Sequence, residues 1–175
     1  APWEREPIEA EIDAVLAREP DPTKWLDAMP LTRAAFEEAL RLYPPAPSIN
    51  REPIEPEKYK DLYIPPKAAV LVMPWTVHRH RKLWADPDRF DPDRFLPEAE
   101  ARFARTQFMP FGAGARVCVG AAFAMTEATV LLAEVLRAVR VAWDGELKPE
   151  PVSRITLHPK GGMRLKLSMV SGAGA

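Results

Sequence analysis

The sequence predicts a mixed α and β fold that is rich in helix and carries small antiparallel sheets. Three stretches have the composition or apolar spacing of helices, and short β-like runs lie between them. Twenty prolines in 175 residues are more than twice the usual share of about 5%. Much of the chain is therefore expected to be loop, turn or sheet edge. No linker separates two parts, so residues 1–175 are expected to form a single domain.

The helices are predicted from periodicity and from their ends. Apolar residues at helical spacing within residues 4–19 predict a helix that starts at about Pro7. The stretch "LTRAAFEEALRLYPP" predicts a second helix, from about Leu31, which two prolines end. An alanine- and leucine-rich stretch predicts a long third helix from about Val119 to Val139.

The remaining segments are predicted as strands, turns and loops. Short β-like stretches run from Ile49 to Val77; "AAVLVMPWTV" is the strongest, and "YIPPK" before it reads as a turn. Residues 84–97 contain Asp-Pro-Asp-Arg-Phe twice, which predicts an ordered loop. Residues 152–168 predict a hairpin, with Pro-Lys-Gly-Gly as its turn, and residues 168–175 a flexible tail.

Composition excludes several classes of function. A net charge of −1 gives no broad attraction to nucleic acid or anionic lipid, and no zinc spacing supports nucleic-acid binding. No apolar run reaches bilayer length and no secretory signal pattern opens the chain, so a soluble, cytoplasmic protein is expected. The single cysteine excludes an internal disulfide and a multi-cysteine zinc site. The first residue is not methionine, which suggests processing or a piece of a longer protein.

The single cysteine, Cys118, lies between a glycine-rich loop and the start of the long predicted helix. A lone cysteine is most often a small buried hydrophobic residue. Here, free N–H groups at a helix start would favour a thiolate, and Arg116 adds a nearby cation. A nucleophilic thiolate would need a base, for which the candidates are three histidines: His78, His80 and His158.

The residues around Cys118 carry a resemblance to a known family. "FGAGARVCVG" fits Phe-x-x-Gly-x-Arg-x-Cys-x-Gly, the haem-binding loop of the cytochrome P-450 family, at all five fixed positions. "EALR" resembles the family's Glu-x-x-Arg helix motif, "PDRF" resembles a loop motif whose arginine joins that pair, and "ITLHPKGGMRLKL" resembles the terminal hairpin. The likeness runs from about Ile8 to Leu167 and implies the C-terminal, haem-binding part of the cytochrome P-450 fold.

The resemblance implies a site for haem b (iron protoporphyrin IX). Cys118 would be the axial ligand of the haem iron, and Arg116 and Arg51 would pair with the haem propionates. The remaining loop positions would shield the sulfur, permit the turn or let the helix approach the porphyrin: Phe111, Gly112, Gly114 and Gly120. Glu38, Arg41 and Arg94 would form a buried triad, whereas a Glu and an Arg at this spacing are by default an exposed pair.

Other positions follow more loosely from the resemblance. Ile49, Ile155 and Thr156 would line the substrate pocket, with ordinary packing as the alternative. His78 lies where some relatives approach the haem edge, although a solvated histidine is the expectation. Arg102 and Arg105 are expected near the face where an acidic electron donor would bind, with solvent exposure as the alternative.

The chain also departs from the family. Members are usually more than twice this length, and the run Ala/Gly-Gly-x-Asp/Glu-Thr of the distal oxygen-activation helix does not occur here. The chain is thus expected to be a fragment, a short protein whose partner supplies the distal wall, or a haem-binding remnant. The missing N-terminal part of the same enzyme is therefore one expected partner.

The function implied for the whole enzyme is that of a haem-thiolate monooxygenase. It would insert one oxygen atom from O₂ into an apolar organic substrate, with electrons from a ferredoxin or reductase. One alternative is a haem-binding module without reductase-dependent oxygenation, with peroxide-driven side activity. Another is a structural domain with a buried Cys118.

Overall fold

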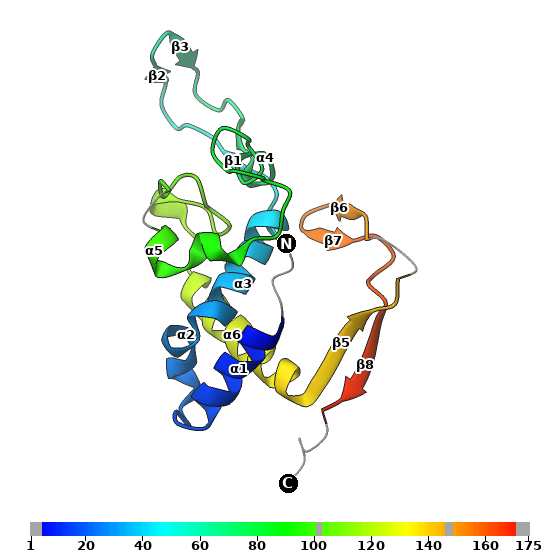
Figure 1. Ribbon diagram of the computed structural model, residues 1–175. Helices are drawn as coiled ribbons and strands as arrows, with labels where there is room; N and C mark the ends of the chain where they lie inside the picture. The colour runs from blue at the N-terminus through cyan, green and yellow to red at the C-terminus, as the bar shows by residue number, and fades with distance from the viewer. Residues whose placement is uncertain (1–4, 101–102, 146–148, 171–175) are drawn as a thin grey trace.

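The structure, a computed structural model, describes residues 5–100, 103–145 and 149–170. It confirms the helix-rich fold with small antiparallel sheets, because the strands in these ranges form sheets of two strands each. The longer helices pack against one another along one side of the molecule (Figure 1). They are α1 (Arg5–Leu16), α3 (Pro30–Leu42) and α6 (Ala121–Ala138).

A hydrophobic core joins α1 and α6 to the segment between α1 and α3. Its buried members, drawn from α1, from α6 and from that segment, are Ile12, Val15, Trp25, Met29 and Ala133. The sequence predicted only a connector there. The structure instead has η1 (Pro22–Lys24) and α2 (Trp25–Ala28), which are too short to give a periodic signal.

Helix α1 also fixes the start of α3. The Glu11 carboxylate accepts hydrogen bonds from the backbone N–H groups of Leu31 and Thr32, each at 2.9 Å. It also accepts one from the Thr32 hydroxyl, at 2.8 Å. These donors lie in the first turn of α3, where backbone N–H groups have no partner within the helix, so a side chain of α1 takes the place of a capping residue.

A second, aromatic cluster packs against α3. Ala34, Trp84 and Phe95 are buried, and Phe103 and Phe108 pack against them. The ring centroids of Phe95 and Phe108 are 4.6 Å apart. Residues 84–97 thus form the ordered loop that the sequence predicted, and the loop ends in η2 (Pro92–Phe95) and α5 (Pro97–Glu100).

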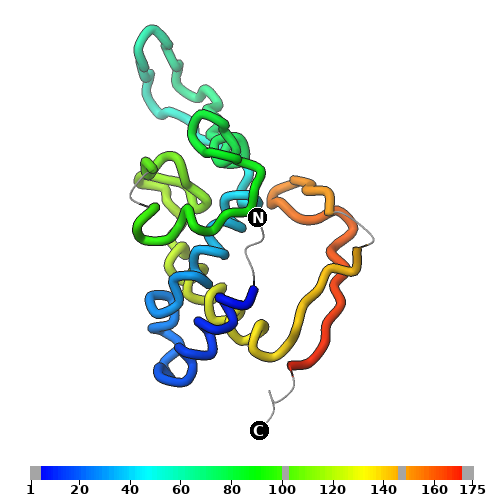
Figure 2. The backbone as a smooth tube through the Cα atoms, in the orientation of Figure 1, coloured from blue at the N-terminus to red at the C-terminus, as the bar shows by residue number. Residues whose placement is uncertain are grey.

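Two small sheets follow α3. Strand β1 (Ile49–Arg51) pairs with β4 (Val70–Val72), and β2 (Glu57–Tyr59) pairs with β3 (Leu62–Ile64) in an arm that extends from the body (Figure 2). The predicted strand "AAVLVMPWTV" is strand only over β4. Pro74, whose nitrogen carries no hydrogen for a ladder, instead begins the short helix α4 (Pro74–Val77).

The predicted C-terminal hairpin is wrong. The strand before the Pro-Lys-Gly-Gly turn, β7 (Leu157–Pro159), pairs with β6 (Pro151–Ser153). The strand after it, β8 (Leu165–Met169), pairs along its whole length with β5 (Val139–Trp143). The backbone of both glycines in the turn is left-handed, and the chain passes there from one sheet to the next.

Ser168 and Met169, predicted as part of the tail, belong to β8, and residues 171–175 lie outside the described residues. Among the helices of the described ranges, none combines the length and apolarity needed to cross a membrane.

Candidate functional site

Residues 109–120 form the glycine-rich loop before α6, which we call the thiol loop because it carries Cys118. Its own backbone closes it. The Cys118 N–H donates to the Phe111 carbonyl at 2.9 Å, and the Val117 N–H donates to the Gly114 carbonyl at 3.1 Å. Gly112 has a φ of +78° and Gly114 a φ of +75°. L-residues rarely adopt these angles, so both positions need glycine for the shape of the backbone. The loop includes η3 (Gly114–Arg116).

Cys118 itself is exposed, which excludes the alternative of a small buried hydrophobic cysteine. It lies shortly before α6, whose N-cap is Gly120, and its carbonyl accepts from the Ala121 N–H at 3.3 Å. A Cβ added at Gly120 would lie 3.9 Å from the Cys118 sulfur. The bare glycine therefore leaves space beside the thiol.

Strand β1 brings two predicted site residues against this loop. A Cβ added at Gly112 would lie 3.5 Å from Ile49 Cδ1 and 3.9 Å from Arg51 Nη2. Arg51 Nη2 also donates to the Arg116 carbonyl at 3.5 Å. The structure therefore places the side chain of Arg51 beside the backbone of Arg116. Arg116 itself is exposed.

Glu38 and Arg41 of α3 lie together with Arg94 of η2. Arg41 donates from Nε and Nη2 to the two Glu38 oxygens at 2.6 and 2.8 Å, and both side chains are fully buried. Arg94 Nε lies 3.7 Å from Glu38 Oε1, which also accepts the Asp91 N–H at 2.8 Å. The default interpretation of an exposed pair is therefore excluded.

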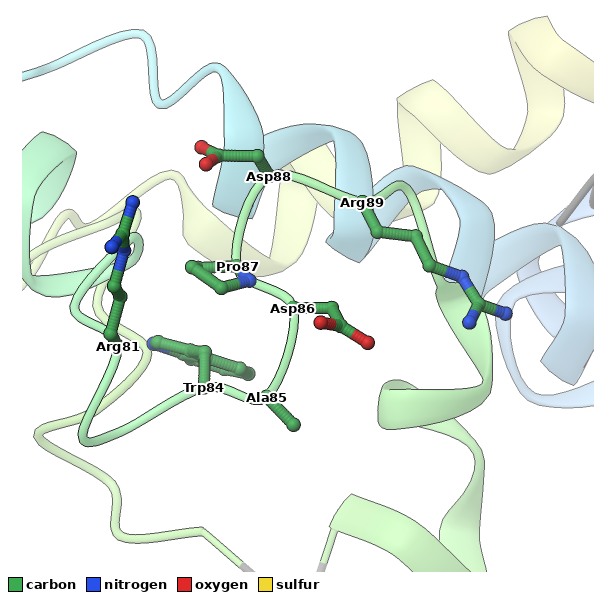
Figure 3. A pocket seen from close by; sticks show the side chains of 7 residues that line it. All are labelled: Arg81, Trp84, Ala85, Asp86, Pro87, Asp88 and Arg89. Carbon is green, nitrogen blue, oxygen red and sulfur yellow. The ribbon is translucent and has the colours of Figure 1, made fainter.

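Arg41 further binds the loop that follows α4. Its guanidinium donates to the carbonyl oxygens of His78 and Pro87, each at 2.7 Å, and of Arg89, at 3.0 Å. Figure 3 shows this loop and the side chains around a cavity of about 540 Å³ in it. None of the predicted site residues lines the cavity, so we assign no function to it.

The interpretation of His78 as a solvated side chain is wrong. His78 is fully buried, and its Nε2 accepts the Met109 N–H at 2.9 Å. Burial lowers the pKa of His78 to about 4; the backbone of Arg41 acts against this shift, and the charges of Arg41 and Arg79 add to it. The ring is therefore neutral at pH 7 and is already bonded to Met109, so it is not a base for Cys118.

The remaining predicted positions are not brought to the thiol loop. Ile155 and Thr156 lie in the turn between β6 and β7, where Ile155 is 93% exposed. The next residue, Leu157, donates its N–H to the Pro45 carbonyl at 2.9 Å, which ties this turn to the segment after α3. Arg105 is exposed, and Arg102 lies outside the described residues.

Comparison with known proteins identifies the family. The family description "Cytochrome P-450" matches residues 5–165. The chain belongs to the cytochrome P-450 family. This is a family of haem-thiolate monooxygenases, whose haem is bound through a cysteine thiolate.

Individual P-450 relatives agree with this assignment. The chain is 37% identical to pentalenene oxygenase of Streptomyces avermitilis over 158 residues, which cover 90% of this chain and 35% of the relative. It is 36% identical to cyclooctatin synthase of Streptomyces melanosporofaciens over 153 residues, which cover 87% and 32%. It is 39% identical to taurochenodeoxycholic 6 alpha-hydroxylase of Sus scrofa over 146 residues, which cover 83% and 29%.

Solved P-450 structures share the fold. A cytochrome P-450 named CYP102L1 superposes with a TM-score of 0.82 at 25% identity, over 94% of this chain and 38% of that one. The cytochrome P-450DA heme domain superposes with a TM-score of 0.84 at 24% identity, over 94% and 37%. This chain thus spans about a third of the length of the relatives it matches.

The residues around Cys118 fit a haem. An exposed sulfur can reach a metal ion, and large apolar side chains near it in sequence, Val119 and Phe123, are exposed as well. A flat apolar group could cover such residues. Arg51, at the end of β1, and Arg116, in the loop, supply two cations, which suits the two carboxylates of haem b.

Proposed function

We propose that this chain is the haem-binding, C-terminal portion of a haem-thiolate monooxygenase, with residues 1–175 acting as one unit. The observation that carries the proposal is the exposed Cys118 on a loop closed by the Cys118 N–H and the Phe111 carbonyl. When bound, the haem would supply the oxygen chemistry, and the thiolate would increase the electron density on its iron.

The other residues would orient the group. Arg51 and Arg116 would pair with its carboxylates. Gly112 and Gly114 would hold the loop in its turn, Phe111 would shield the sulfur, and Gly120 would let the start of α6 approach the ring. Glu38, Arg41 and Arg94 would support the loop from the opposite side through the 78–94 segment.

The whole reaction would be the insertion of one oxygen atom from O₂ into an apolar organic substrate. Two relatives carry names of this kind, an oxygenase and a hydroxylase, and those names describe only those proteins. Of the three candidate substrate-lining residues, Ile49 is the best placed to contact substrate, because it lies against the Gly112 turn. Ile155 and Thr156 would contact substrate only if a further part of the enzyme brings them near it.

Two protein partners complete this proposal. Electrons would come from a ferredoxin or reductase, and exposed Arg105 would contribute to binding an acidic donor. The N-terminal part of a P-450 would cover the exposed apolar residues near the thiol, because the chain spans only about a third of its relatives.

A second candidate function is haem binding with peroxide-driven side activity. It is favoured by the exposure of Cys118 and of Val119, which leaves the cysteine side of the loop open to water. An open site does not protect reactive intermediates. This candidate and the monooxygenase share the same haem ligand and differ in the oxidant that supports turnover.

The test is to add haem to the purified chain, reduce it under carbon monoxide and record the Soret band, with Cys118→Ala as the control. A strongly red-shifted band that the variant lacks is expected, because only a thiolate ligand gives it. Absence of haem uptake, or a band of equal position in both proteins, would overturn the proposal for the isolated chain. Product formation with peroxide and with an electron donor then separates the two candidate functions.

A further inference from the structure

His78 lies between the buried Glu38–Arg41 pair and the thiol loop, which are far apart in the sequence. It follows α4, and its carbonyl accepts Nη1 of Arg41 at 2.7 Å. Its ring nitrogen Nε2 accepts the N–H of Met109 at 2.9 Å. One fully buried residue therefore contacts the buried ion pair through its backbone and the thiol loop through its side chain.

The hydrogen bonds continue from Met109 to the thiol. The Met109 carbonyl accepts the Gly112 N–H at 3.0 Å, at the residue whose φ is +78°. The Phe111 carbonyl in turn accepts the Cys118 N–H at 2.9 Å. Met109 is thus held at both ends of its backbone, by His78 on one side and by the loop on the other.

The side chain of His78 is suited to this contact, and its other neighbours include the ring of Phe108 and the backbone of Arg41. Among the described residues, no hydrogen bond of normal geometry reaches its buried Nδ1. The ring lies beside Phe108, with centroids 5.4 Å apart, which limits its rotation. For Nε2 to accept a hydrogen bond, the hydrogen of the neutral ring must be on Nδ1. The contact with Met109 therefore selects one neutral tautomer.

We propose that His78 is a positioning residue that transmits the order of the Glu38–Arg41 ion pair to the thiol loop by accepting the Met109 N–H. Without this acceptor the Met109 N–H is left unpaired in a partly buried position, and the turn at Gly112 loses its fixed start. The inference rests on the proposed function only in its consequence for haem; the effect on the loop exists without it.

The test compares two substitutions of similar length. His78→Gln keeps an acceptor near the position of Nε2, and His78→Met fills the space without one. Hydrogen exchange of the haem-free chain is measured at the Met109, Gly112 and Cys118 amides. In His78→Met we expect exchange at these amides to be at least about tenfold faster, with exchange in α1 and α6 unchanged and with His78→Gln close to the parent.

The alternatives give different patterns. Equal exchange at these amides in the parent and His78→Met overturns the proposal. So does faster exchange that is uniform over α1, α6 and the loop, because that pattern means general destabilisation. Equal loss in both variants also overturns it, since the acceptor would then be irrelevant.

Haem provides a second and separate readout. If the parent chain shows the red-shifted carbon monoxide band, the fraction of haem with that band is expected to fall in His78→Met and to be retained in His78→Gln. If the parent shows no such band, the proposed function fails for this chain, and the exchange experiment still decides the role of His78.

Discussion

Two ion pairs of the same chemistry behave differently in this molecule. Glu38–Arg41 and Glu134–Arg137 have the same spacing, and each has an N···O distance of 2.6 Å. The side chains of the first pair are 0% exposed, and those of the second are 43% and 54% exposed. Because spacing and distance are equal, the difference lies in what surrounds each pair.

The surroundings of the first pair are backbone groups from a distant segment. Carbonyls of His78, Pro87 and Arg89 accept from Arg41, and the Asp91 N–H donates to Glu38. The thiol loop shows the opposite arrangement, with Cys118, Val119 and Phe123 exposed. The chain thus supplies hydrogen-bond partners for the buried charges of Glu38 and Arg41 from its own backbone. It leaves the residues around the thiol exposed.

The largest expected effect is on the buried pair. Glu38→Ala leaves the Arg41 charge buried without its partner, and we expect a loss of about 3–5 kcal/mol of unfolding free energy, or no folded protein. Glu134→Ala, the matched control, is expected to cost less than about 1 kcal/mol. Urea unfolding followed by circular dichroism measures both, and equal losses would contradict the comparison.

The next effect is the pH dependence of His78. Its pKa is about 4 in the folded chain and about 6.5 when unfolded. Above pH 6.5 the ring is neutral in both states and contributes no pH dependence. As the pH falls from 6.5 to 4 only the unfolded state takes up the proton, so stability falls, by about 3 kcal/mol in total.

His78→Gln isolates this contribution from the carboxylates that titrate in the same range. The variant is expected to lose less stability between pH 7 and pH 4.5 than the parent, because position 78 no longer binds a proton. Parallel stability curves for the two proteins over this range would show that His78 is not buried in its neutral form.

Which parts of this structure the sequence could predict depends on how local their cause is. The three longer helices follow from apolar spacing and from prolines at their ends, which act within a few residues. Glu38, Arg41 and Arg94 were named from a resemblance, because the spacing of Glu38 and Arg41 is equally that of the exposed pair on α6. The burial of Arg41 depends on carbonyls that lie 37 to 48 residues away in sequence.

The errors have the same origin. The burial of His78 could not be predicted from its neighbours in sequence, because Met109, whose N–H its ring accepts, lies 31 residues further along the chain. The hairpin at residues 152–168 was wrong because turn residues indicate only that the chain turns there. The partner of β8 is β5, which pairs with it over all five residues and precedes β6 and β7 in the chain.

A smaller effect is expected within the thiol loop. Gly114 has a φ of +75° and no atom within 4 Å of an added Cβ, so Gly114→Ala tests backbone strain without a steric clash. We expect a cost of about 1–2 kcal/mol. Gly120→Ala is the control, because the φ of Gly120 is −88° and an added Cβ makes an ordinary contact with the Cys118 sulfur. A cost at Gly120 equal to that at Gly114 would show that space, rather than φ, limits this loop.

The smallest effect on stability is expected at the residue that matters most for the proposed function. Cys118 is exposed, so Cys118→Ser removes little buried surface, and the free energy of unfolding of the haem-free chain should change by less than about 0.5 kcal/mol. The same substitution should abolish the red-shifted carbon monoxide band, because a hydroxyl does not replace a thiolate on iron. A large loss of stability in the haem-free chain would mean that the sulfur is packed within the protein, and the contrast between a closed support and an open thiol would then be lost.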